Sequence, residues 1–472
     1  MIKWLFTLFL TLPLIYPKPV SAHAFGKLYN LPVPFWMYLY GGAAAIIVSF
    51  LIIGFLFNKK SNKISYPTKN LSVIPSFSFL SKELFLNLLR GVSVFLFSLT
   101  ILAGLIGEDS PYSNFNMTFF WIIFTLGLTY LTAFVGNIWA IINPWKVLSE
   151  WFEKLTGEKI KGVVVYPQSL GYYPALFFYF LFIWVELMAQ TFPRQLSFIL
   201  VQYTVINIAG IILIGKQSWF TYCEFFSVFF RLVGKIAPVE YRDGKLYLRP
   251  PFVGLLKEKA EHFSLLLFVL FMLSSTAFDG FRSTTPWYRF YFQNVDELLT
   301  PIFGASANTL FQTAGLALSP FVFLAIFLIL VSIAKLVAKS RTSLFDLSLQ
   351  FAYSLVPIAF VYNVAHYYTL ILTEGQNIIR LASDPFGFGW NLFATSNYLV
   401  NLSIIDANFT WHFQVALILA GHIVGTYLAH VIALNTFTSH KRVLVSQFPM
   451  LCLMVIYTMI GLWILSQPIT SE

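Results

Sequence analysis

The chain contains ten stretches that are each apolar enough and long enough to cross a lipid bilayer. A spanning helix needs about 20 mostly apolar residues, because each residue advances about 1.5 Å through a hydrocarbon core about 30 Å thick. The stretches lie near residues 36–57, 84–107, 117–138, 173–192, 196–215, 262–280, 316–337, 346–372, 411–434 and 443–465. Only 11% of the residues are charged, too few to cover a water-soluble protein of 472 residues. The sequence therefore predicts an all-α, polytopic membrane bundle and excludes soluble enzymes, nucleic-acid-binding proteins and secreted disulfide scaffolds.

The first residues have the pattern of a secretory signal peptide. Lys3 supplies the positive charge, residues 4–15 form an apolar core, and small residues follow near position 22. Cleavage after Ala22 or after Ala24 fits equally well, and an uncleaved anchor is disfavoured because about a dozen apolar residues are short for a span. We expect a signal peptide over residues 1–22 and a single transmembrane domain over 23–472. If His23 becomes the first residue, its amine and imidazole offer a surface ligand for copper.

The basic residues give the orientation of the spans. With the mature N-terminus outside, the inward loops and adjoining span ends hold 23 of the 30 Lys and Arg residues, and the outward loops hold five. Such a bias is what the positive-inside rule requires. We therefore expect a multi-pass protein of the bacterial inner (plasma) membrane with both mature termini extracytoplasmic. The basic inner face would lie against anionic lipid of the bilayer. The net charge of +10 therefore does not require a nucleic acid as a partner.

Two segments that follow inward-running spans resemble each other. Residues 145–156 alternate apolar and charged side chains at the helical period, and residues 219–233 repeat the pattern Trp-x4-Glu followed by aromatic residues. We predict that both lie along the cytoplasmic interface as helices. Two interpretations of the likeness stay open: an internal duplication, which is common in transporters, or a shared aromatic composition.

Ionisable residues inside spans are costly to bury and are therefore candidates for function. Glu186 lies about two turns from the outer end of the fourth span, and Asp279 lies at the outer end of the sixth. His366 is in the outer third of the eighth span, and His422 is near the middle of the ninth. If these two spans are antiparallel neighbours, the histidines differ in depth by roughly 7 Å, a gap that tilt could close.

These four residues suggest several kinds of site. His366 and His422 are the candidate metal ligands, for zinc, iron or copper, with Glu186 and Asp279 as the candidate catalytic carboxylates. A haem held by the two histidines is an alternative. A third interpretation is that the histidines only bond neighbouring helices and lock the bundle together. We predict that His366 and His422 belong to one outward-facing site, which they share with Glu186 or Asp279.

Several short motifs give the chain a resemblance to a known family. They are His23-Ala24-Phe25-Gly26, Leu31-Pro32-Val33-Pro34-Phe35-Trp36, Gly136-Asn137-Ile138-Trp139, Asn143-Pro144-Trp145, Ala365-His366-Tyr367, Gly375-Gln376, Asp384-Pro385 and Gly421-His422. In overall pattern, over most of its length, the chain resembles bacterial polytopic membrane proteins named as fenitrothion hydrolase components. The resemblance implies hydrolysis of a lipophilic organophosphate triester, with a partner membrane subunit, and it assigns no residue a role.

Three functions therefore follow as hypotheses. The first is an inner-membrane hydrolase, or a component of one, in which a divalent metal ion activates water. The second is a membrane transporter, suggested by Glu186 at membrane depth and by the repeated segments. The third is a haem- or copper-binding redox protein built on His366 and His422.

Overall fold

The computed structural model describes residues 34–56, 66–437 and 440–467. The predicted signal peptide, its cleavage sites and His23 lie outside these residues. Each of the ten predicted spans falls on a helix, and nine of these helices in the described residues are long and apolar enough to cross a membrane. The tenth, α9 (Tyr173–Met188), has 16 residues and is shorter. The predicted all-α polytopic fold is confirmed, and the chain is a multi-pass membrane protein.

Most spanning segments are single helices, and two of them combine several helical elements. The spanning elements are α2 (Phe35–Leu56), α4 (Glu83–Ile106), α5 (Phe115–Met117) with the π-helix η4 (Thr118–Leu128) and α6 (Thr129–Val135), α9, α10 (Pro193–Ile214), α13 (Phe263–Arg282), α16 (Ala307–Val337), α17 (Leu344–Phe351) with η9 (Ala352–Leu355) and α18 (Val356–Leu372), α20 (Ala407–Thr436) and α21 (His440–Ser466). The connecting helices are η2 (Leu71–Val73), α3 (Pro75–Ser78), η3 (Phe79–Ser81), α7 (Trp139–Ile142), α8 (Pro144–Thr156), η5 (Gln168–Leu170), α11 (Lys216–Ser218), the π-helix η6 (Trp219–Cys223), α12 (Phe225–Gly234), η7 (Val253–Leu255), α14 (Thr285–Asn294), α15 (Asp296–Phe303), η8 (Gly304–Ser306), η10 (Glu374–Gln376), α19 (Asn377–Ser383) and η11 (Leu402–Ile404).

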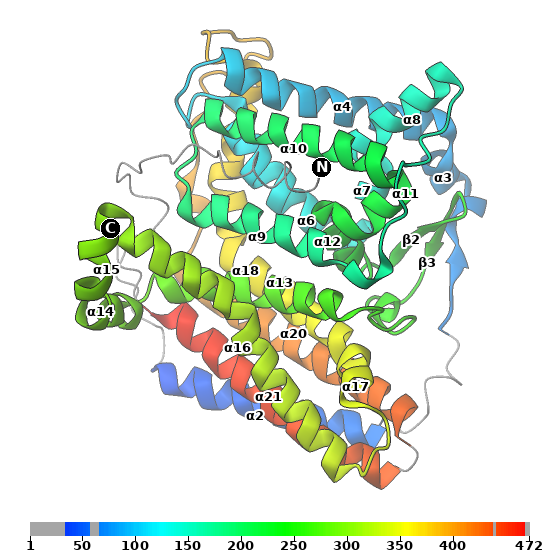
Figure 1. Cartoon of the computed structure of the whole chain (residues 1–472), viewed down its shortest axis with the longest axis vertical. Coiled ribbons are helices and arrows are strands. Elements are labelled where there is room, and N and C mark those ends of the chain that lie inside the picture. The colour runs from blue at the N-terminus through cyan, green and yellow to red at the C-terminus, as the bar shows by residue number, and fades with distance from the viewer. Residues whose placement is uncertain (1–33, 57–65, 438–439, 468–472) are drawn as a thin grey trace.

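The helices form two groups with α13 between them (Figure 1). The first group contains α4, α6, α9, α10 and α12, and the second contains α2, α16, α18, α20 and α21. Helix α13 packs against α9 of the first group and against α16 and α18 of the second. Fifteen consecutive residues of α13, 264–278, are buried, as expected for a helix that is apolar all round and covered on every side. Helix α13 is therefore the element that joins the two groups.

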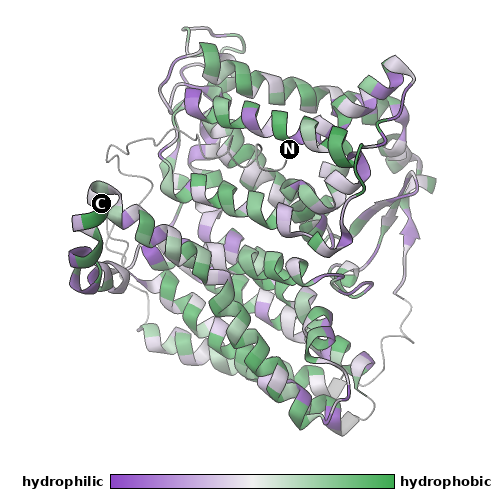
Figure 2. Ribbon diagram, viewed as in Figure 1, coloured by the Kyte–Doolittle hydropathy of each residue, from purple (hydrophilic) through white to green (hydrophobic). Residues whose placement is uncertain are grey.

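The long helices are hydrophobic over most of their length (Figure 2), and several of them expose large apolar side chains. Phe95 on α4, Val205 on α10 and Phe321 on α16 are 64%, 60% and 54% exposed. Exposed apolar surface on so many long helices is unfavourable in water and suits contact with lipid tails. The apolar helices thus agree with the predicted lipid bilayer as a partner.

A small sheet lies at one end of the bundle (Figure 1). Strands β1 (Lys69–Asn70), β2 (Val239–Arg242) and β3 (Lys245–Leu248) are antiparallel in the order β1-β3-β2. Asp243 and Gly244 turn the β2–β3 hairpin with φ angles of 52° and 73°, the left-handed values that a two-residue turn of this kind requires. This end belongs to the side that the charge bias assigns to the cytoplasm.

Helix α8 has the amphipathic surface that the sequence predicts. Asn143 caps its N-terminus by accepting a hydrogen bond from the amide of Lys146. Trp145 is buried, whereas Phe152 and Leu155 are 56% and 87% exposed on the apolar side of the helix. Its position along the cytoplasmic interface stays a prediction.

The second segment, residues 219–233, differs from the expected interfacial helix. Glu224 adopts an extended conformation and separates the π-helix η6 from α12. Seven of the ten residues of α12 are buried, so this helix lies inside the protein with little surface left for an interface. Glu224 caps a helix, whereas its counterpart in the repeated pattern, Glu150, lies within α8. Glu150 and Glu224, which correspond in the repeated pattern, therefore do not occupy equivalent structural positions.

Candidate functional site

A cavity lies where the first helix group meets α13 and α18. Its walls come from η4, α6, α9, α12, α13 and α18. Its polar lining residues are Thr125, Thr129, Tyr179, Glu186, Ser275, Thr276, Asn363 and Tyr367. Its apolar walls are mainly the rings of Phe182, Phe225, Phe226, Phe229 and Phe230. Among the described lining residues, Glu186 is the single charged one.

The aromatic wall depends on the short helix α12, whose N-terminus is held by Glu224. The Glu224 carboxylate accepts hydrogen bonds from the Phe226 and Ser227 amides at 3.0 and 2.8 Å. Four side chains complete its shell by donating to it: Ser227 Oγ at 2.6 Å, Tyr203 Oη at 2.9 Å, Asn143 Nδ2 at 3.1 Å and Trp139 Nε1 at 3.2 Å. A negative charge at this end complements the helix dipole, and the many donors offset its complete burial.

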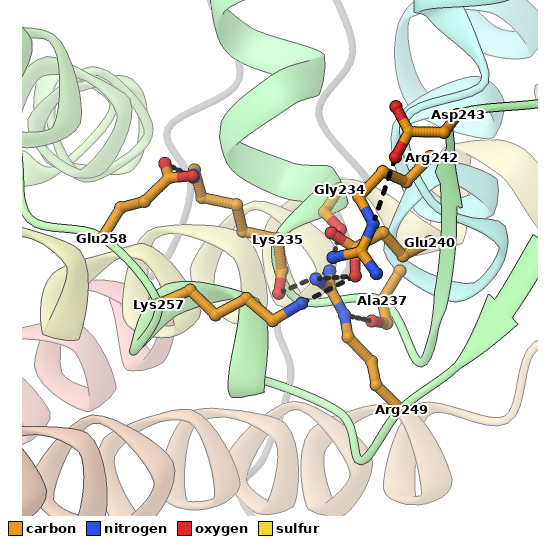
Figure 3. Close-up of polar contacts among 9 residues, drawn as sticks. All are labelled: Gly234, Lys235, Ala237, Glu240, Arg242, Asp243, Arg249, Lys257 and Glu258. Atoms are coloured by element: carbon orange, nitrogen blue, oxygen red, sulfur yellow. Dashed lines mark hydrogen bonds and ion pairs between the residues drawn. The ribbon is translucent and has the colours of Figure 1, made fainter. Parts of the chain in front are cut away.

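The other end of α12 is held by a buried arginine (Figure 3). Arg249 donates from Nη2 to the Gly234 carbonyl at 3.2 Å and from Nε to the Ala237 carbonyl at 3.1 Å. Its Nη1 lies 3.2 Å from Glu240, to which Lys257 also donates at 2.7 Å. A positive charge satisfies the free carbonyls at a helix C-terminus. Both ends of the helix that lines the cavity are therefore fixed by hydrogen bonds to a buried ionisable side chain, Glu224 at the N-terminus and Arg249 at the C-terminus.

A polar network centred on Asp279 adjoins the cavity. Asp279 Oδ2 lies 2.9 Å from His366 Nε2 and accepts a hydrogen bond from Tyr367 Oη at 2.7 Å. Its other oxygen accepts from Arg282 Nε at 3.2 Å, and Arg282 in turn donates to Gln312 at 2.9 Å. Because Tyr367 also lines the cavity, it connects this network to the space beside Glu186.

The structure thus brings Asp279 and His366 together and places Glu186 in the neighbouring cavity. Their catalytic roles stay predictions. The charge of Asp279 is compensated by Arg282 and by its hydrogen-bond donors, so Glu186 is the carboxylate that faces open space.

The structure does not bring His422 to this network. The Gln414 side chain donates to the Ala365 carbonyl at 2.8 Å, which fixes the register of α20 against α18. His422 lies eight residues further along α20, about 12 Å deeper than the level of His366. Its Nδ1 lies 2.8 Å from the Ile418 carbonyl, and among the described residues its Nε2 has no hydrogen-bond partner. The predicted shared site of His366 and His422 is therefore wrong, because the helix register differs from the one assumed.

The register of α20 against α18 also affects the predicted metal ion and haem, because both would need His366 and His422 together. Within the described part of the chain, no group of three or more His, Cys, Asp or Glu residues could hold a metal ion. The separation of the two histidines likewise disfavours a haem held between them. The other histidines of α20 bond elsewhere, His412 to Tyr38 and His430 to Gln447.

Sequence analysis missed several residues of this region. Glu224 was noticed only as part of a repeated pattern, although a carboxylate within an aromatic run is itself a signal of a special environment. Asn363 stands three residues before His366 and was not singled out. The Arg282–Gln312 bond joins α13 to α16, and no local pattern indicates it.

Comparison of the chain with protein-family models, with curated proteins and with solved structures finds no match. The resemblance to fenitrothion hydrolase components therefore stays a prediction.

Proposed function

We propose that the protein is a secondary transporter of the bacterial plasma membrane and that the cavity beside Glu186 is its substrate site. One observation carries this proposal: a cavity with a single carboxylate lies between two helix groups and is walled by a short, broken helix. Ionisable residues within membrane bundles mark substrate or ion pathways, and transporters commonly bind their substrates at interrupted helices.

The irregular helices around the cavity support this proposal. Residues Thr118–Leu128 form a π-helix that contributes Thr125 and Leu126 to the lining, and the break at Glu224 precedes the aromatic wall. Irregular backbone at membrane depth is tolerated where it is buried in protein or lines a cavity. Such segments can also rearrange at lower cost than continuous helices.

The orientation belongs to the same proposal. The sheet and the Arg249 cluster would face the cytoplasm, and α14 and α15, beyond the Asp279 end of α13, would lie outside. A topology reporter inserted near Lys245 should then report the cytoplasm, and one fused after Glu472 should report the periplasm. Equal reports from both fusions would contradict this orientation.

The decisive test needs no knowledge of the substrate. In a variant lacking Cys223 and Cys452, a thiol is placed in the cavity by Ser275→Cys and, as a matched control, one residue away by Ser274→Cys. Ser274 is buried against Ser319 and does not line the cavity. A membrane-impermeant maleimide should modify the Ser275→Cys protein from either side of sealed vesicles, because a transporter alternates its access. The Ser274→Cys protein should stay unmodified, and labelling of Ser275→Cys from one side only would refute transport.

A hydrolase is the second candidate, favoured by the contact between Asp279 and His366. A carboxylate that orients an imidazole is the arrangement used in general acid–base catalysis. Under this proposal the protein, alone or with a partner membrane subunit, hydrolyses a lipophilic organophosphate triester, and His366 accepts a proton from water. Release of nitrophenol from fenitrothion by the purified protein, lost in His366→Ala, would favour the hydrolase over the transporter.

A further inference from the structure

We infer that the cavity binds a small organic cation, specifically an alkylammonium ion that carries at least one N–H group. This inference rests on the proposed function and names the substrate class of the same site. A bound cation would pair with the carboxylate form of Glu186, and the described lining residues include no Lys, Arg or His. An anionic substrate would therefore find no cationic partner in the described lining.

The walls of the cavity favour an organic cation over a hydrated metal ion. The ring of Phe225 contacts those of Phe226 and Tyr179, with centroids 3.9 Å and 5.9 Å away. Phe182 extends the same wall, 5.5 Å from Phe226. Aromatic faces attract alkylammonium groups, whereas small metal ions need several oxygen ligands at short range.

A second polar group in the cavity lacks a partner. Asn363 lines the cavity, and its buried Oδ1 has no hydrogen-bond donor in the structure. A buried acceptor of this kind costs free energy until a donor reaches it. An ammonium N–H group supplies such a donor while its charge pairs with Glu186. A neutral apolar ligand would leave both acceptors without a partner.

Calorimetry on the purified full-length protein in lipid nanodiscs tests the inference. The probes are tert-butylammonium and tert-butanol, which have nearly the same shape and differ in charge. The cation should bind at least tenfold more tightly than the alcohol, and an equal excess of NaCl or KCl should not displace it. Tetramethylammonium, which has no N–H group, should bind more weakly than tert-butylammonium.

Two variants locate the binding. Glu186→Gln should weaken tert-butylammonium binding at least tenfold, and Glu297→Gln, which changes an exposed carboxylate in α15, should leave it unchanged. Phe226→Leu should weaken binding of the cation about threefold or more without affecting the alcohol. Phe230→Leu serves the same purpose if the first aromatic variant has a lowered melting temperature. Equal binding of cation and alcohol, or binding that survives Glu186→Gln, would overturn the inference.

The two proposals can fail separately. If Ser275→Cys is labelled from both sides but no ammonium ion binds, transport stands and the substrate class is wrong. If the cation binds at Glu186 while labelling occurs from one side only, the binding site stands and transport is wrong.

Discussion

The surroundings of Glu186 and Glu224 differ, although both carboxylates lie within the first helix group. Glu224 is fully buried and receives hydrogen bonds from two backbone amides and from side chains on α7 and α10, among others. Glu186 instead lines the cavity beside α12. The rings of Phe225 and Phe226, which directly follow Glu224 in the chain, form part of the wall opposite this open space.

The difference shows that a carboxylate at membrane depth is not by itself a mark of function. What matters is whether the protein already satisfies its charge and lone pairs. Glu224 is satisfied and serves to fix α12, whereas Glu186 borders space that only a ligand or water can fill.

The largest effect is expected at Glu224. Glu224→Ala leaves six donor contacts without an acceptor and should lower the free energy of unfolding by roughly 3–5 kcal/mol. Glu186→Ala should cost less than about 1 kcal/mol, because it removes a charge from a cavity. Melting temperatures of the detergent-purified variants provide the measurement. Equal decreases in melting temperature for Glu224→Ala and Glu186→Ala would show that the two carboxylates do not differ in their structural role.

A smaller loss is expected at the other end of α12. Arg249→Met removes the cation from the carbonyls of Gly234 and Ala237 and leaves Glu240 with one partner fewer. We expect destabilisation of about 2–3 kcal/mol. Arg242→Met is the control, since this arginine is about half exposed beside Asp243 and should change stability by less than about 0.5 kcal/mol. Similar melting temperatures for both variants would show that α12 does not need its C-terminal charge.

The two histidines extend the comparison to residues that sequence analysis placed together. His366→Phe breaks the contact with Asp279 and should cost about 2 kcal/mol. His422→Phe removes a ring whose Nε2 has no partner and should change stability by less than about 1 kcal/mol. Thermal unfolding of the two purified variants gives the comparison. A double variant should show additive losses, because the residues do not share a contact.

The smallest expected effect is a pH dependence at Glu240. Burial raises the pKa of this carboxyl, but the hydrogen bond from Lys257 and the charge of Arg249 hold the pKa below its usual value. A lowered folded-state pKa contributes stability above the unfolded value of about 4.3, and this contribution is lost as the pH falls through the folded value. The melting-temperature difference between wild type and Glu240→Gln should therefore shrink from pH 6 to pH 3. If the melting-temperature difference stayed constant over this pH range, the effect of Glu240→Gln would come from altered packing and not from the lost charge.

Sequence analysis could predict the fold because spanning helices depend on local composition. A run of about 20 apolar residues is stable in a bilayer as a helix whichever neighbours it meets, since the helix satisfies its own backbone hydrogen bonds. Each of the ten predicted spans consequently matches a helix, including α9, whose 16 residues are the fewest. The same local cost of burying charge singled out Glu186, Asp279 and His366.

Partners, in contrast, were decided by the tertiary structure. The sequence places His366 and His422 on consecutive spans, yet the bond between Gln414 and Ala365 sets a register that separates them and leaves His366 beside Asp279. Packing likewise decides whether residues 219–233 are buried, because their aromatic pattern is compatible with both an interfacial helix and a buried helix. Helix register and side-chain contacts depend on how segments that are distant in the sequence pack together. The spacing of apolar residues within one segment does not determine that packing.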